Sequence, residues 1–192
     1  LEMKKILCVL LLLLTGCSSK TSMIEIQKHV YVEKEFKDSW LETNEFGDSY
    51  IKEELQGGYH YHFDQQFLEI FFNTGGKIEL YNYSIKKNDL IISGEMIPPK
   101  TIRLVHPHLD NVTSEGVIIH ELGHYFDEKH QFSSSKQFTE LYKKYRTLFN
   151  QKTKKEYFAE CFKEYVGGHQ EKVKPFHSYM KTITQKIRQK NK

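Results

Sequence analysis

The chain has 192 residues, of which 39% are hydrophobic, enough to bury the core of one domain. It carries 28 Lys or Arg against 25 Asp or Glu, and the formal net charge of +3 excludes the strongly basic balance of a nucleic-acid-binding protein. A single domain acting as a monomer is the expected organisation.

An export signal is predicted over residues 1–16. Two lysines precede an apolar run over residues 6–14, which is too short to span a membrane. The segment Leu14-Thr-Gly-Cys17 resembles the lipobox of bacterial lipoproteins. This implies cleavage before Cys17, acylation of its sulfur, and a protein held by lipid on the extracytoplasmic side of the bacterial cell membrane. An ordinary signal peptide with an incidental Cys17 is the alternative. The two residues before the first methionine are expected to be a cloning scar.

The rest of the chain divides into a short tether over residues 17–22, which begins at the lipidated Cys17, and one catalytic domain over residues 23–192. Cysteine usage agrees with this division, because Cys8 leaves with the signal and Cys17 carries lipid. Only Cys161 remains in the domain, so no internal disulfide is predicted.

Strand and helix signals alternate in the first part of the domain. Apolar residues at alternate positions over residues 24–32 indicate a strand or extended segment. A short helix is predicted over residues 48–55, ended by two glycines, and residues 59–62 alternate like a strand. Asp64 is placed to cap a helix through Phe72.

The middle of the chain predicts β structure. Residues 77–85 and 90–96, joined by a Lys-Lys-Asn-Asp turn, indicate a hairpin. Residues 101–106 predict a further strand. This strand is the candidate sheet edge for holding an extended substrate peptide.

The second half predicts helices. One follows residue 111, a second is capped by residues 133–135, and a third opens at Thr153 and ends at two glycines. Residues 172–192 predict a docked amphipathic helix with seven Lys or Arg and no Asp or Glu. A solvated basic face is favoured over contact with anionic lipid or cell-wall polymer. The pattern predicts an α+β domain with a β-rich N-terminal half and a helical C-terminal half.

A metal-binding motif lies in the first of these helices. His120, Glu121 and His124 form HExxH, and positions four apart on a helix share a face. Both imidazoles can therefore reach one zinc ion, with Glu121 beside a metal-bound water. The motif alone could be a coincidence on a surface helix. Its apolar flanks instead indicate a buried helix, where these side chains need a common partner. Suitable N-cap residues precede it, namely Asn111, Thr113 and Ser114.

The third zinc ligand has two candidates on a later helix. Glu156 and Glu160 lie four residues apart in Lys155-Glu-Tyr-Phe-Ala-Glu-Cys-Phe162, so one can bind zinc while the other braces a ligand histidine. Thr153 and Glu156 also fit a capping box, and in that case Glu160 would be the ligand. The residues alone leave this choice open.

HExxH followed by Glu-aromatic-Phe-Ala-Glu resembles the anthrax lethal factor family of metalloproteases, which includes the secreted Pro-Pro endopeptidases. The resemblance covers about residues 100–170. It implies a zincin-like fold and a gluzincin-type zinc endopeptidase acting on proteins or peptides, with a preference for proline near the cut. It also implies that His120, His124 and Glu156 bind one zinc ion. Glu121 is then the base, and Glu160 matches the second acidic residue of the family motif.

One position departs from this family pattern. Family members carry a tyrosine seven residues before the ligand Glu, where it donates to the oxyanion, and the residue here is Phe149. Either Tyr145 or Tyr142 substitutes for it, or transition-state stabilisation is weaker. The alternative function is therefore a zinc-binding lipoprotein that acts as a binding module with little or no catalysis.

His130 offers a different third ligand. It lies ten residues after His120, the spacing of the metzincin motif HExxHxxGxxH. However, Asp127 replaces the turn glycine, and the only later methionine is Met180. A surface position after the helix is the favoured interpretation of His130.

Overall fold

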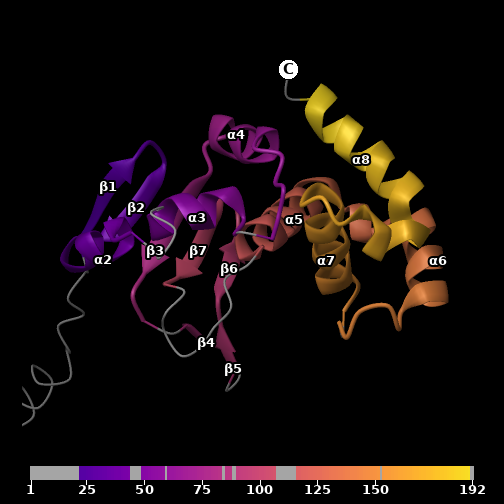
Figure 1. Cartoon of the computed structure of the whole chain (residues 1–192). Helices are drawn as coiled ribbons and strands as arrows, with labels where there is room; N and C mark the ends of the chain where they lie inside the picture. Colours follow the sequence, from indigo (N-terminus) through magenta and orange to yellow (C-terminus); the bar gives the residue numbers. More distant parts are fainter. Residues whose placement is uncertain are drawn as a thin grey trace, which may run out of the picture.

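The computed structural model describes residues 22–43, 49–58, 60–83, 85–87, 90–106, 116–151 and 153–190 (Figure 1). The predicted export signal, the predicted lipid on Cys17 and the predicted N-cap residues Asn111, Thr113 and Ser114 lie outside these residues. A β-rich N-terminal half packs against a helical C-terminal half, as the sequence predicted.

A five-stranded mixed sheet forms the N-terminal half, in the order β1-β2-β3-β7-β6. The three central strands are parallel, and β1 and β6 are antiparallel strands at the two edges. The central strands β3 and β7 alternate: Ile78, Leu80, Ile102 and Leu104 are buried on one face, whereas Lys77, Glu79 and Arg103 form ion pairs on the other. The strands are β1 (Met23–Gln27), β2 (Val30–Glu33), β3 (Lys77–Tyr81), β6 (Gly94–Ile97) and β7 (Thr101–Val105).

One strand prediction is wrong in its pairing, and another is confirmed only in part. β7 is not an edge, because it lies between β3 and β6, and the edge beside it is β6. The predicted hairpin is confirmed only beside its turn, where β4 (Ile85–Lys87) pairs antiparallel with β5 (Leu90–Ile92) in a separate two-stranded sheet. β3 takes no part in this hairpin. The reason lies in β3, whose last four residues are all buried and which takes a parallel neighbour on each side.

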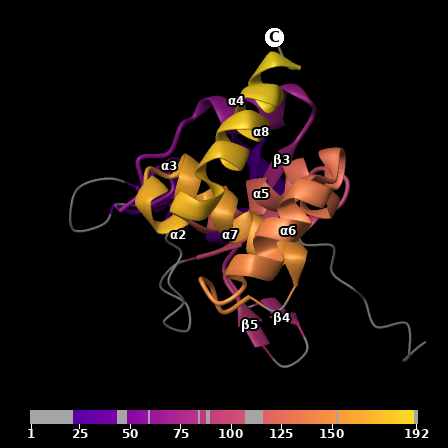
Figure 2. The same cartoon turned by 90° about the vertical axis from the view of Figure 1, so that its right-hand side faces the viewer.

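Helical segments surround the sheet and build the second half (Figures 1 and 2). In the first half they are η1 (Lys34–Phe36), α2 (Lys37–Leu41), α3 (Tyr50–Gln56) and α4 (Gln66–Asn73). In the second half they are α5 (Val117–His130), η2 (Phe132–Ser134), α6 (Lys136–Tyr145), α7 (Lys154–Val166), η3 (Gln170–Phe176) and α8 (His177–Gln189).

Most predicted helix starts are confirmed by their capping bonds. Asp64 lies one residue before Gln65, the N-cap of α4, and its Oδ1 accepts from the Gln66 amide at 3.0 Å. Ser135 Oγ accepts from the Phe138 amide at 3.1 Å. These bonds satisfy amides that the first helical turn leaves without a partner. α5 differs, since it begins after Gly116, whose φ of 72° suits glycine.

The predicted strand at residues 59–62 is wrong for the residues described there. Residues 60–62 form coil, and the His62 amide donates to the Gly167 carbonyl at 2.8 Å. The Tyr61 hydroxyl donates to Glu164 on α7 at 3.0 Å. The alternating pattern here reflects packing on the end of α7 rather than a sheet.

The predicted docking of the last helix is confirmed. Its apolar positions are buried against the domain, namely Phe176, Met180, Ile183 and Ile187. Within the described part of the chain, no helix is long and apolar enough to span a membrane. Cys161 is a buried free thiol on α7.

α5 and α7 form the closest helix pair around the site. A Cβ added at Gly123 of α5 would lie 2.9 Å from the backbone Cα of Ala159 on α7. Real Cβ atoms do not approach a backbone atom so closely, so only glycine permits this spacing. Phe126, Phe158 and Phe162 pack beside the contact and are fully buried.

We expect Gly123→Ala to force α5 and α7 apart and to lower the free energy of unfolding by about 1–3 kcal/mol, the usual cost of overpacking. Because α5 carries His120 and His124, two of the predicted zinc ligands, zinc affinity should fall as well. Chemical denaturation and zinc titration measure the two effects. Gln137→Ala, at an exposed position of α6, is the control. Unchanged stability and zinc affinity in Gly123→Ala would contradict the tight contact.

Candidate metal centre

Three side chains with possible metal ligand atoms converge where α5 packs against α7. His120 and His124 lie one turn apart on α5, and their Nε2 atoms are 3.2 Å apart. Glu156 Oε2 on α7 lies 3.3 Å from each of these nitrogens. These three residues form a group that could hold a metal ion.

This triangle of donor atoms fits zinc. Zinc–ligand bonds of about 2.0–2.1 Å at tetrahedral angles place the ligand atoms about 3.3 Å apart. The three observed separations are 3.2, 3.3 and 3.3 Å. Two histidines and one carboxylate are also a ligand set that catalytic zinc sites use, with the fourth position left open.

The capping-box alternative for Glu156 is not completed. The Glu156 amide donates to Thr153 Oγ1 at 3.2 Å, which is half of a capping box. The Glu156 carboxylate does not return to Thr153 but faces the two imidazoles. The geometry therefore favours Glu156 over Glu160 as the third ligand.

Glu160 takes the bracing position behind His120. Its Oε2 lies 3.2 Å from His120 Nδ1, and its Oε1 lies 2.7 Å from Lys163 Nζ. A proton on Nδ1 donated to Glu160 leaves Nε2 free to bind a metal. Lys163 balances the charge of this carboxylate. Sequence reasoning did not identify Lys163, although its position three residues after Glu160 places it on the same helical face.

Without a metal, the site holds a proton at His120. Burial lowers the pKa of His120, but hydrogen bonds to Glu156 and Glu160 outweigh burial and raise this pKa to about 9. Hydrogen bonds to His120 and His124 hold the pKa of Glu156 well below its usual range. A metal cation bound among these side chains would replace the proton on His120, because the cation would balance the charge of the same Glu156 carboxylate.

Glu121 lies beside the triangle and is only 6% exposed. Burial raises its pKa, while His120, His124 and a hydrogen bond from the Met96 backbone offset part of this effect. A carboxylate with a raised pKa accepts and releases a proton more readily near neutral pH. Glu121 is therefore suited to act as a general base.

A cleft of about 550 Å³ opens at the three ligands and Glu121. The edge strand β6 forms one wall, and α5 and α7 form the other. A neighbouring hollow of about 350 Å³ shares Gly94, His120 and Glu121, so the groove continues past the site. Gly94 permits this arrangement, since a Cβ there would lie 2.6 Å from Val117 Cγ1 and 3.0 Å from the Arg103 carbonyl oxygen.

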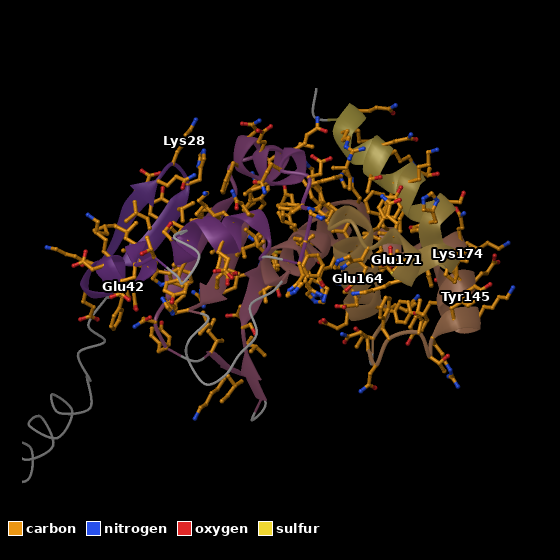
Figure 3. All side chains as sticks on the ribbon, in the orientation of Figure 1. Lys28, Glu42, Tyr145, Glu164, Glu171 and Lys174 are labelled. Carbon is orange, nitrogen blue, oxygen red and sulfur yellow. The ribbon has the colours of Figure 1, made fainter. Side chains whose placement is uncertain are left out.

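The tyrosines considered as oxyanion donors lie outside the described lining of this cleft. Tyr142 and Phe149 pack against the Tyr157 ring, with centroids 5.1 and 5.2 Å away. Tyr145 packs on Phe176, at the outer end of the helical half (Figure 3). Among the described residues, Lys155 is the only lysine or arginine that lines the larger cleft.

His130 does not join the metal ligands. α5 stays helical through residue 130, so the metzincin turn is not formed. Asp127 explains this, because its buried carboxylate accepts from the Ser133 amide at 2.7 Å and from the Ser133 hydroxyl at 2.6 Å. The His130 ring packs against Phe132 with a centroid distance of 5.1 Å.

No model of a known protein family matches this chain, and no curated protein matches it. The assignment of the site therefore depends on the geometry of its own side chains.

We expect zinc affinity to rise with pH and to level off above about pH 9. Below that pH the proton on His120 competes with the metal, so one displaced proton gives about a tenfold gain per pH unit. Competition titration with a chelator of known proton affinity measures this slope from pH 7 to 10. An affinity independent of pH over this range would contradict the protonated metal-free site.

Proposed function

We propose that this protein is a zinc-dependent endopeptidase. The observation that carries the proposal is the triangle formed by His120, His124 and Glu156, with the buried Glu121 beside it in an open groove. When bound, zinc would supply Lewis acidity toward a water and a peptide carbonyl. The likeness of these residues to the lethal factor family supports the same reaction and a zincin-like fold.

Glu121 is the proton carrier of this mechanism. Its carboxylate accepts a proton from the attacking water and passes it to the leaving amine. Its raised pKa and buried position suit both steps. A hydrogen bond from the Met96 backbone links this carboxylate to the edge strand β6.

The edge strand β6 is the proposed substrate-binding strand. β6 pairs with β7 on one side only, and Met96 directs its amide toward Glu121 on the other. Backbone groups alternate along an antiparallel strand, so those of Gly94 face the same side. An extended peptide would pair with this edge and cross the metal centre.

The predicted lipobox supports a place outside the cytoplasm, with the protein held to the cell membrane through Cys17. The substrates are then extracytoplasmic proteins or peptides within reach of the anchor. The family resemblance adds a preference for proline near the scissile bond. A peptide library for this protein should therefore include proline at every position around the cut.

A zinc-binding lipoprotein that captures a partner without cutting it is the second candidate. The observation that favours it is the absence of a tyrosine from the described lining of the groove. Zinc binding would then have a structural role, and Glu121 would have no kinetic one. The two candidates differ in the behaviour of Glu121 variants.

We expect Glu121→Gln to keep zinc at a stoichiometry near one and to reduce peptide cleavage by about a hundredfold or more, because the general base is lost. His120→Ala should lose zinc binding. Cleavage of the peptide library, followed by mass spectrometry, gives the activity. Equal background cleavage by wild type and Glu121→Gln would favour the binding module. A zinc stoichiometry near one in His120→Ala would refute the ligand assignment.

Lys155 is the proposed oxyanion donor in place of the missing tyrosine. Its ammonium group lies 3.3 Å from Glu128 in an exposed pair, which is weak enough to open for substrate. We expect Lys155→Met to lower kcat by about 10- to 100-fold with little change in KM. Lys154→Met is the matched control, since Lys154 bonds Thr139 instead. Equal kcat values for both variants and wild type would remove Lys155 from the mechanism.

A further inference from the structure

The charge of this protein is divided between its two halves. Residues 22–128 contain nine Lys or Arg and 19 Asp or Glu, whereas residues 129–192 contain 16 Lys or Arg and five Asp or Glu. Three of those five acids, Glu156, Glu160 and Glu164, lie in the metal centre or in contacts along α7. The low overall net charge thus hides a strongly cationic helical half.

Eight of these cations lie on or directly after α6, η3 and α8, are exposed, and have no carboxylate partner among the described residues. We call them the cationic helical surface. Arg188 and Lys172 are excluded, because they pair with Asp64 and Glu164. Glu140 and Glu171 are the exposed acids on the same elements. The eight cations are Lys136, Lys143, Lys144, Arg146, Lys174, Lys181, Lys186 and Lys190.

The helices that carry this surface lie together on one side of the molecule. In Figure 2, α6 and α8 both face the viewer, with the sheet behind them. Figure 3 places Lys174 at this end and Lys28 of the β1–β2 turn at the other. The cations therefore form one field rather than a scatter over the whole surface.

Along α8 the surface lacks the side chains that insert into a bilayer, and next to α6 the one exposed large hydrophobic residue among those described is Leu148. The apolar residues of α8 are all used in the core, and its exposed positions hold only polar or basic residues. An interfacial membrane helix needs an exposed apolar face. The contact that this surface can make is electrostatic.

The predicted lipid anchor also argues against a membrane as the occupant. Six residues from Cys17 to Met23 reach at most about 20 Å. A domain of this size is about 40 Å across, and Figure 1 places β1 and α8 at opposite ends. With the domain standing on its anchored end, the cationic surface would lie farther from the bilayer than the Debye length of about 10 Å.

We propose that the cationic helical surface binds a linear polymer of phosphate groups in the cell envelope. Regularly spaced phosphates match a field of unpaired lysines spread over two helices, and binding releases counterions from the polymer. The surface is distinct from the groove at the metal centre. Such binding would hold the protein within the envelope polymer without occupying that groove.

The test uses a chain from Ser18 to Lys192 and long-chain inorganic polyphosphate as the probe. This chain keeps the whole described core, which runs from Val30 to Ile187. One triple variant carries Lys181→Glu, Lys186→Glu and Lys190→Glu on α8. The matched control carries Lys28→Glu, Lys34→Glu and Lys37→Glu in the sheet half, with the same change in net charge. A third variant, with Lys143→Glu, Lys144→Glu and Arg146→Glu on α6, replaces the α8 variant if that one does not fold.

Wild type and the control should bind polyphosphate, and the α8 or α6 variant should bind at least about tenfold more weakly. Wild-type affinity should fall by about 10- to 100-fold between about 50 and 200 mM salt. Absence of binding, or equal weakening in the control, would overturn the proposal. So would equal or tighter binding to vesicles of phosphatidylcholine and phosphatidylglycerol, which would identify a membrane surface instead. Peptide cleavage plays no part in this test, so its outcome is independent of the proposed protease activity.

Discussion

The close contact between Gly123 and Ala159 sets the geometry of the metal centre. Gly123 immediately precedes His124, and Ala159 follows Glu156 by one turn, so the contact lies beside the ligands. Each helix is rigid over one turn. The separation of α5 and α7 therefore decides how far the imidazole nitrogens of His120 and His124 lie from the Glu156 carboxylate. The surrounding aromatic core holds that separation.

Behind the candidate metal site, α7 carries a chain of charges that leads away from His120. Glu160 contacts His120, Lys163 contacts both Glu160 and Glu164, and Glu164 is 4% exposed. Lys172, His169 and Tyr61 complete the partners of Glu164. A buried carboxylate is stable only when it is paired in this way. The coil around Tyr61 is therefore part of the support of the site.

Sequence reasoning succeeded where structure is local. Thr153, Ser135 and Asp64 mark helix starts by their own side chains, and the spacing of His120 and His124 specifies a shared face on any helix. The pairing of strands was not accessible in this way. β3 joins β2 and β7 across long stretches of chain, and no residue in β3 or β7 reveals which strand becomes the edge. The spacing of α5 and α7 is equally non-local, since Gly123 acquires its role only once Ala159 lies against it.

The choice between Glu156 and Glu160 required both helices in place, because each carboxylate lies near His120. Glu156 contacts Nε2 of both histidines, whereas Glu160 contacts only Nδ1 of His120. X-ray absorption at the zinc edge of the zinc-loaded protein measures that choice most directly. The account predicts four light ligands at about 2.0–2.1 Å, with the multiple scattering of two imidazoles and no sulfur. The absorption spectra of the two zinc-loaded variants Glu156→Gln and Glu160→Gln should differ in one respect. The zinc ligand shell should change in Glu156→Gln and stay the same in Glu160→Gln. An unchanged shell in Glu156→Gln, or fewer than two imidazoles in the wild type, would contradict it.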